Sequence, residues 1–237
     1  MNIVSLPEHK IELSNKIVSA YSFYYQVGDA LINHKPLSVV RMGDGEHTLI
    51  NEILDNVDLS APSEAYDEAW HKRMGTYGIS RLDLYNRLME AGNTCSHFAP
   101  SVSGLALDCF NLFGYFEPRD HYVDNFFVNI WSVEQQIKLY QEAQSIIFIH
   151  RNRATADAIQ KRCKQYLGVK LRYLELSSWE QTDSVIADAV SDTEARLVLF
   201  AGGPASKYLS PRIATSNKVV LDLGNSTDQW TLLSLTR

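Results

Sequence analysis

The chain contains few cysteines and no long uninterrupted apolar run. Cys95, Cys109 and Cys163 are widely spaced and form no C-x-x-C pair, which argues against a disulfide framework or a zinc site. A protein with so few cysteines suits a reducing compartment, and we expect a cytoplasmic location. No stretch approaches the roughly 18 apolar residues of a membrane span, and the N-terminal segment lacks the pattern of a signal peptide.

Positive charge is also scarce, because 22 Lys and Arg residues face 28 Asp and Glu residues, for a net charge of -6. This balance disfavours a nucleic-acid partner without excluding a local basic groove. The chain has 237 residues, 45% of them hydrophobic, which suits a globular protein with its own core. We therefore expect a single domain over residues 1–237.

Several common catalytic motifs are missing. The seven histidines include no H-x-x-x-H pair, which disfavours a zinc hydrolase. The glycine-rich segments match neither G-x-G-x-x-G nor a Walker loop with its lysine. Ser206 lies outside any G-x-S-x-G elbow, which disfavours a serine hydrolase of the α/β-hydrolase type.

Apolar runs typical of buried strands alternate with segments of helical period, most clearly in the second half of the chain. The expected strands are 36–42, 93–99, 145–150, 169–176, 195–203 and 217–225. The expected helices are 11–33, 46–54, 63–74, 79–92, 103–116, 154–168, 182–192 and 204–214. This pattern predicts an α/β fold with a mostly parallel, doubly wound, Rossmann-like sheet flanked by helices. The helical stretch from about 60 to 118 could form a cap.

Two acids stand at the expected junction of the first strand and the next helix, in the segment SVVRMGDGEHTLI. Carboxylates at Asp44 and Glu46 could face one ligand and bind Mg²⁺ or Mn²⁺ together with a diphosphate. Gly43 and Gly45 would let the backbone approach that ligand closely. Arg41 could pair with one of the acids or bind phosphate.

A second interpretation of the same segment requires no ligand. Asp44 is a favoured N-cap residue, and Glu46 would lie in the first helical turn, where the helix dipole stabilises anions. Spacing alone does not decide between capping and metal binding, and one residue can do both.

Other candidates follow expected strands, because ligands of open α/β sheets bind at the carboxyl ends of the strands. Gly202, Gly203 and Pro204 join a strand to a helix, where backbone N–H groups could cradle phosphate or simply form a tight turn. Arg151 could neutralise a diphosphate or lie in a solvated loop. Asp222 could bind a hydroxyl, accept a proton or form an Asx turn.

The segment from 118 to 131 combines aromatic rings with hydrogen-bonding side chains, including Asp120 and Asp124. Such a mixture suits a sugar or nucleobase site, and either acid could act as a general base. The same composition is also typical of a segment that is half core and half turn.

The segment SVVRMGDGEHTLI resembles the R-x-G-D-G-E motif of a bacterial glycosyltransferase family with the GT-D fold, formerly a domain of unknown function. LVLFAGGPASKYL resembles the strand, GPTA and helix segment of that family, and VVLDLGNSTDQW resembles its closing D-x-G-H-x-D-x-x-x-W segment. The resemblance spans residues 37 to 230. The chain departs from it at Asn225, where the family often has histidine, and at Ala205, which replaces the threonine.

The resemblance implies a metal-dependent glycosyltransferase of the hexosyltransferase type with a nucleotide-sugar donor, most simply a UDP-sugar. It maps the donor and metal site onto Asp44 and Glu46, with Mn²⁺ or Mg²⁺ as the cofactor. The acceptor would be a hydroxyl of a glycan, a glycoprotein or another molecule, and Asn225 would belong to the donor site. Two alternatives remain: a non-catalytic nucleotide-sugar binding module, and a phosphate-ester hydrolase with Asp44 as the nucleophile.

Overall fold

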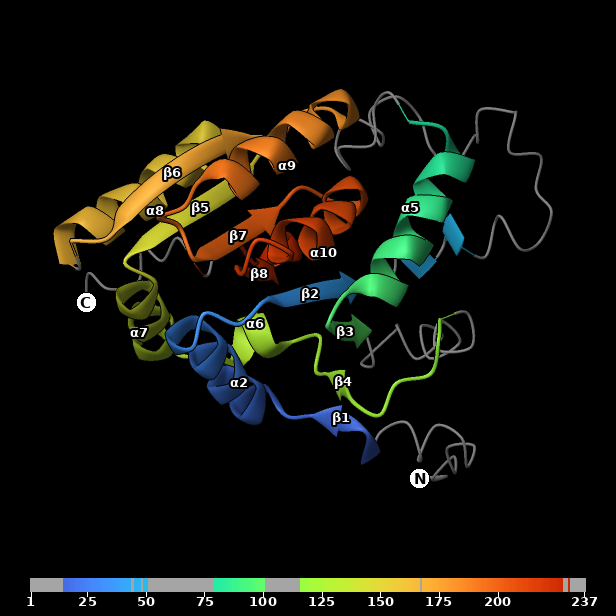
Figure 1. Cartoon of the computed structure of the whole chain (residues 1–237), viewed down its shortest axis with the longest axis horizontal. Coiled ribbons are helices and arrows are strands. Elements are labelled where there is room, and N and C mark those ends of the chain that lie inside the picture. The colour runs from blue at the N-terminus through green and yellow to red at the C-terminus, as the bar shows by residue number, and fades with distance from the viewer. Residues whose placement is uncertain are drawn as a thin grey trace, which may run out of the picture.

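The computed structural model of the chain describes residues 15–43, 45–47, 49–50, 79–100, 116–166, 168–227 and 230. Six strands form one fully parallel sheet in the order β3-β2-β8-β7-β5-β6 (Figure 1). These strands are β2 (Leu37–Met42), β3 (His97–Pro100), β5 (Ser145–His150), β6 (Lys170–Glu175), β7 (Leu197–Ala201) and β8 (Val219–Asp222). The expected α/β fold with a parallel sheet is confirmed.

Helices cover both faces of this sheet. They are α2 (Ala20–Ile32), α5 (Arg81–Thr94), α6 (Phe127–Ile130), α7 (Val133–Ala143), α8 (Arg153–Tyr166), α9 (Thr182–Ser191) and α10 (Leu209–Ala214). Short 3-10 helices are η2 (Trp179–Gln181), η3 (Pro204–Tyr208) and η4 (Gly224–Ser226). Apolar side chains of α2, α6, α7 and α8 share one core cluster with the sheet, whereas α5, α9 and α10 pack on the opposite face.

Serine caps explain where several helices begin. Ser19 caps α2, so that helix starts later than the expected residue 11, and Ile17–Val18 form the short strand β1. Ser80 caps α5 in the same way. Ser132 and Gln135 form a capping box at the start of α7, a helix that our sequence analysis did not assign.

Residues from about 60 to 118 were expected as a possible helical cap. The part of this stretch that the structure describes instead joins the main sheet, through β3, and covers it, through α5. β3 pairs with β2, and α5 packs against η3 and α10. A second, two-stranded sheet of β1 and β4 (Tyr122–Val123) lies beside β3. The remaining residues between 60 and 118 fall outside the described part of the chain, and the single-domain organisation stays a prediction.

The neighbouring strands β2 and β8 pair at their beginnings and then part. Their recorded register joins Leu37 to Val219 and Ser38 to Val220. Further along, the carbonyl of Val39 accepts a hydrogen bond from Ser210 Oγ on α10 at 2.8 Å. The helix after β2 packs with α5, whereas the segment after β8 enters the core on the other face. A crevice between diverging strand ends is the usual ligand position in open α/β sheets.

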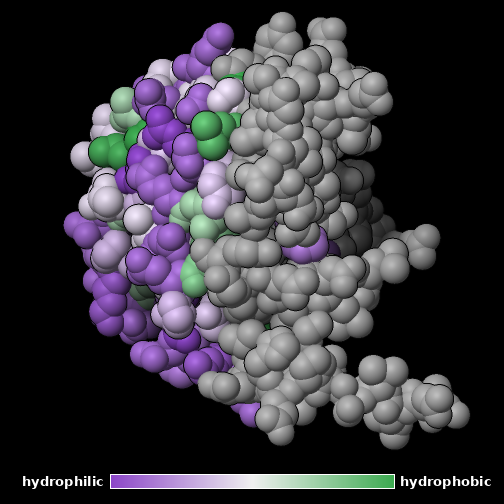
Figure 2. Space-filling model, turned by 90° about the vertical axis from the view of Figure 1, so that its right-hand side faces the viewer, coloured by the Kyte–Doolittle hydropathy of each residue, from purple (hydrophilic) through white to green (hydrophobic). Residues whose placement is uncertain are grey.

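Polar residues dominate the described surface on the side shown in Figure 2, where hydrophobic residues are scattered. The most exposed large apolar side chains belong to Tyr21, Ile32, Tyr25 and Ile130. Within the described residues, no helix is both long and apolar enough to span a membrane.

His97, at the start of β3, is expected to make folding pH-dependent. Burial and the positive charge of Arg119 lower the pKa of His97 to about 4, from an ordinary value near 6.5. The unfolded chain therefore takes up a proton first as pH falls, and the free energy of unfolding should drop between about pH 6.5 and pH 4, by about 1–3 kcal/mol. Urea unfolding across this range measures the effect.

The His97→Gln variant should lose most of this pH-dependent drop, because glutamine carries no proton in this range. The exposed His121 supplies the control, since His121→Gln should unfold with the wild-type pH dependence. An unchanged slope in His97→Gln would assign the pH dependence to other groups.

A buried ion cluster between two diverging strands

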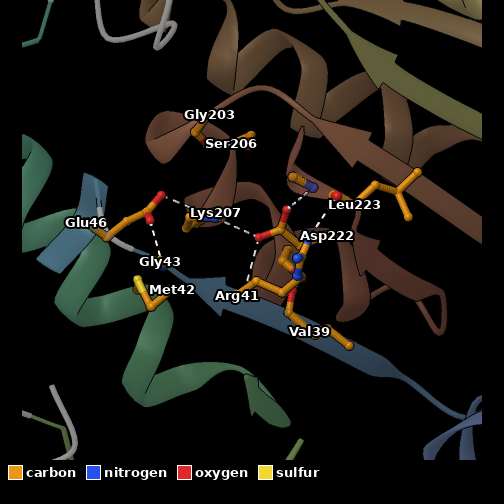
Figure 3. A network of polar contacts seen from close by, with 12 residues as sticks. Val39, Arg41, Met42, Gly43, Glu46, Gly203, Ser206, Lys207, Asp222 and Leu223 are labelled. Atoms are coloured by element: carbon orange, nitrogen blue, oxygen red, sulfur yellow. Dashed lines mark hydrogen bonds and ion pairs between the residues drawn. The ribbon is translucent and has the colours of Figure 1, made fainter. Parts of the chain in front are cut away.

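A single ammonium group joins the ends of β2 and β8. Lys207 Nζ lies 2.8 Å from Asp222 Oδ2 and 3.3 Å from Glu46 Oε1 (Figure 3). The side chains are almost completely buried, with exposed fractions of 6% for Lys207, 9% for Glu46 and 1% for Asp222. The fold thus brings together two of the predicted acids, Glu46 and Asp222, from opposite ends of the chain.

Glu46 is held by the turn that follows β2. Its Oε2 accepts a hydrogen bond from the Gly43 N–H at 2.8 Å, and the carbonyl of Gly43 accepts one from the His47 N–H. Gly45 and Glu46 lie in the helix that begins here. The carboxylate therefore folds back over the helix start, while its other oxygen faces Lys207.

Asp222 uses both carboxylate oxygens. Oδ1 accepts from the Gly224 N–H at 2.9 Å, and Oδ2 accepts from the backbone N–H of Arg41 at 3.2 Å as well as from Lys207. The contact with Arg41 replaces a backbone ladder bond at the point where β2 and β8 part. With three donors around it, the Asp222 side chain is well placed to hold the shape of the site.

Arg41 joins three segments of the chain. Its Nε donates to the carbonyl and to Oδ1 of Asn125, at 2.9 and 2.6 Å, and its Nη1 donates to the carbonyl of Leu223 at 2.6 Å. The amide of Asn125 in turn reaches the carbonyl of Met42. These contacts connect β2 to the loop before α6 and to the end of β8, so the contacts of Arg41 in this structure are structural.

Opposite charges compensate each other in this cluster. Burial by itself would lower the pKa of Lys207, but the negative charges of Asp222 and Glu46 outweigh burial and raise it. Burial lowers the pKa of the Arg41 guanidinium, against the opposing effect of Asp222, Glu46 and Asp124. Both cations remain charged at neutral pH, and breaking one pair would leave a buried charge without a partner.

The other predicted residues lie around the cluster or outside the described part. Gly203 has a φ of +73°, the Gly202 N–H donates to Ser206 Oγ, and Pro204 begins η3. The loop therefore satisfies part of its own backbone, as a tight turn does. A Cβ on Gly202 would come within 2.9 Å of Ser206 Cβ, so glycine is required there.

Asp124 is half-buried beside Asn125, and its Oδ1 accepts from the Phe126 N–H at 2.8 Å in an Asx turn. Arg151 is exposed directly after β5. Asp120 lines a pocket of about 280 Å³ beside His97, among residues that do not belong to the ion cluster. Asp44 lies outside the described residues, and the side chain of Asn225 is likewise not described.

The acids of the cluster fit a divalent cation with few protein ligands. Glu46 and Asp222 already share one cation, the Lys207 ammonium, and carboxylate oxygens suit Mg²⁺ and Mn²⁺. Over the described residues, no three His, Cys, Asp or Glu side chains gather closely enough to hold a metal ion. Such a site would need Asp44 or phosphate oxygens as further ligands.

Lys207 and Asn125 are the members of the cluster whose positions the sequence did not predict. Lys207 follows the glycine turn after β7, in a 3-10 helix whose neighbours are buried. A lysine at an otherwise buried position after a strand end is a recognisable signal, since lysine is rarely buried without a partner.

Comparison with known proteins places the chain among glycosyltransferase folds. The GT-D fold-like domain family matches residues 18–230. The solved structure described as "The highly conserved domain of unknown function 1792 has a distinct glycosyltransferase fold" is similar, with 18% identity, a TM-score of 0.59 and coverage of 91% of this chain and 80% of that chain. No curated protein matches the chain.

Two further solved structures are similar. A selenomethionine-substituted structure of domain of unknown function 1792 has 18% identity and a TM-score of 0.58, covering 91% of this chain and 82% of that one. "A New Glycosyltransferase (DUF1792) from Streptococcus sanguinis" has 16% identity and a TM-score of 0.55, covering 85% and 79%. The predicted GT-D fold is therefore confirmed.

Replacement of Gly224 should disturb the cluster through Arg41. Gly224 has a φ of +51°, and a Cβ there would come within 2.7 Å of Arg41 Nη1. Gly224→Ala should therefore lower the free energy of unfolding by about 3 kcal/mol, through backbone strain and displacement of the guanidinium. Chemical denaturation measures this loss.

Gly168 provides the matched control. Its φ is +62°, but nothing lies within 4 Å of an added Cβ. Gly168→Ala should cost only the backbone strain, about 1–2 kcal/mol. Equal losses in the two variants would mean that the contacts of Arg41 contribute little.

Proposed function

Since the chain belongs to the GT-D fold-like family, we propose that it transfers a sugar from a nucleotide-sugar donor to an acceptor hydroxyl. The observation that carries the proposal is the position of Glu46, Lys207 and Asp222. These buried charges lie between β2 and β8, where the strands diverge and open α/β sheets bind ligands. The donor is most simply a UDP-sugar, as the family resemblance implies.

Asp44 and Glu46 would hold Mn²⁺ or Mg²⁺ and, through it, the diphosphate of the donor. Glu46 is already oriented by the Gly43 N–H, and its other oxygen points into the cluster. When bound, the divalent cation would offset the negative charge that develops on the departing diphosphate. Gly43 and Gly45, which carry no Cβ, would let the backbone approach a phosphate group closely.

Arg41 and Asp222 are positioning residues in this proposal. Asp222 fixes the backbone at Arg41 and Gly224, and Arg41 fixes Asn125. Asp124 is the better candidate for the general base, because it is half-buried and Asp222 is enclosed by donors. Proton acceptance by Asp124 would let an acceptor hydroxyl attack the anomeric carbon.

Two further groups would border the donor. The turn of Gly202, Gly203 and Pro204 follows β7 at the same edge of the sheet, and it would form one wall of the nucleotide site. Arg151 follows β5 at this edge and would attract the diphosphate before it binds. Asn225, which lies in η4, would contribute to the donor site as well.

The Glu46→Gln variant tests the proposal directly. Glutamine keeps nearly the same shape and can still accept the Gly43 hydrogen bond, but it loses the charge that a cation requires. Calorimetry with UDP and a panel of UDP-sugars, with and without Mn²⁺, should give metal-dependent binding to the wild type. Binding to Glu46→Gln should be at least about tenfold weaker.

Glu175, the exposed last residue of β6, supplies a matched acid at the same edge of the sheet. Glu175→Gln should bind as the wild type does. If the wild type binds no nucleotide of the panel, the donor assignment is wrong. If Glu46→Gln binds as tightly as the wild type, Glu46 serves only the helix start.

A non-catalytic nucleotide-sugar binding module is the alternative, and turnover separates it from the enzyme. A transferase should hydrolyse its bound donor slowly in the presence of Mn²⁺, even without an acceptor, and release nucleoside diphosphate. Donor binding without any such release would favour the binding module.

A further inference from the structure

The two ion pairs of Lys207 are unequal. The contact with Asp222 is a 2.8 Å hydrogen bond between nearly enclosed groups, and Asp222 is also anchored by two backbone donors. The contact with Glu46 is longer, at 3.3 Å, and Glu46 has one backbone donor among its described contacts. Lys207 can therefore leave Glu46 more easily than it can leave Asp222.

An ammonium group has three N–H donors, and in Lys207 two of them face carboxylates. The side chain has little freedom to withdraw, because it is only 6% exposed and belongs to η3, most of whose described residues are buried. Lys207 thus stays between the ends of β2 and β8 whether or not it contacts Glu46. A cation fixed at this place competes with any other cation for Glu46 and attracts any nearby phosphate.

We propose that Lys207 is a counterion that exchanges partners. It neutralises Glu46 in the free protein and donates to the diphosphate of the nucleotide-sugar when the donor binds, while keeping its contact with Asp222. This inference rests on the proposed function and adds a substrate contact to it. The phosphate oxygens replace one carboxylate oxygen as acceptor, so the ammonium never lacks a partner in the crevice.

Partner exchange couples the two ligands. When Lys207 moves to the diphosphate, Glu46 becomes free to bind a divalent cation. Nucleotide and metal should then each raise the other's affinity, and by the same factor, since coupling of binding free energies is reciprocal. A metal that bridges Glu46 and the diphosphate already couples the two ligands, and partner exchange would add to that coupling, whereas a lysine that only filled space or stabilised the fold would add nothing.

The Lys207→Met variant gives effects of opposite sign. Methionine fills similar volume without charge, so Glu46 loses its competitor and Mn²⁺ alone should bind about tenfold more tightly than to the wild type. UDP alone should bind about tenfold more weakly, because its diphosphate loses a charge-assisted hydrogen bond. Calorimetry with Mn²⁺ alone, UDP alone and both together measures the three affinities.

Lys207→Met alone could fail to fold, because it leaves the buried Asp222 carboxylate without its cation. The same comparison can then be made in a protein that already carries Asp222→Asn. In Asp222→Asn the ammonium retains Glu46, and adding Lys207→Met removes that competitor without leaving a buried aspartate charge. The double variant should bind Mn²⁺ more tightly, and UDP more weakly, than Asp222→Asn alone.

Lys218 offers a matched control lysine. It is also buried, at 3% exposed, but it precedes β8 at the opposite end of the strand and donates to the carbonyls of Asp192 and Ala195. Lys218→Met should lower stability and leave both affinities at the wild-type values. A loss of affinity in that variant would show that general destabilisation mimics the expected effect.

The outcomes separate this inference from the proposed function. Tighter Mn²⁺ binding together with weaker UDP binding supports partner exchange. A parallel weakening of both ligands, or no change in either, overturns it, while Glu46-dependent binding to the wild type would leave the proposed function standing. If the wild type binds neither Mn²⁺ nor UDP, both the proposed function and the inference are wrong.

Discussion

The shared ammonium of Lys207 is the interaction on which the site depends. Where β2 and β8 part, their backbone groups no longer pair with each other and need other hydrogen-bond partners. Lys207, Asp222 and Ser210 supply such partners from their side chains. The same side chains, Lys207 and Asp222, therefore balance the buried charges and hydrogen-bond where the strands part.

The sequence predicted the elements with the strongest patterns. The apolar runs of β5, β7 and β8 cannot lie at a surface, and their alternation with helices leads directly to a parallel sheet. Glu46 and Asp222 were also predicted, because strand ends of a parallel sheet meet at one edge. That rule depends only on the order of strands and helices, so it can predict that residues as distant in sequence as Glu46 and Asp222 lie at the same edge of the sheet.

Other features depend on tertiary contacts that no local pattern encodes. Arg41 was expected to pair with an acid or to bind phosphate, and nothing in the sequence indicated that its guanidinium would also hydrogen-bond to Asn125 and to the carbonyl of Leu223. The family's closing tryptophan, Trp230, is fully buried and donates to the carbonyl of Val128, so this part of the motif serves the core. The capping box of α7, by contrast, is a local signal, since Ser132 and Gln135 have the spacing of such a box in the sequence.

The order of the strands also constrains when the site can form during synthesis. β8, the last strand of the sheet, inserts between β2 and β7, and Asp222 meets the backbone of Arg41 across 181 positions of sequence. The acidic turn after β2 leaves the ribosome long before its counterion at Lys207 exists. Contacts of such long range form late in folding. A nascent chain therefore has no finished site, and binding competence arrives only with the completed sheet.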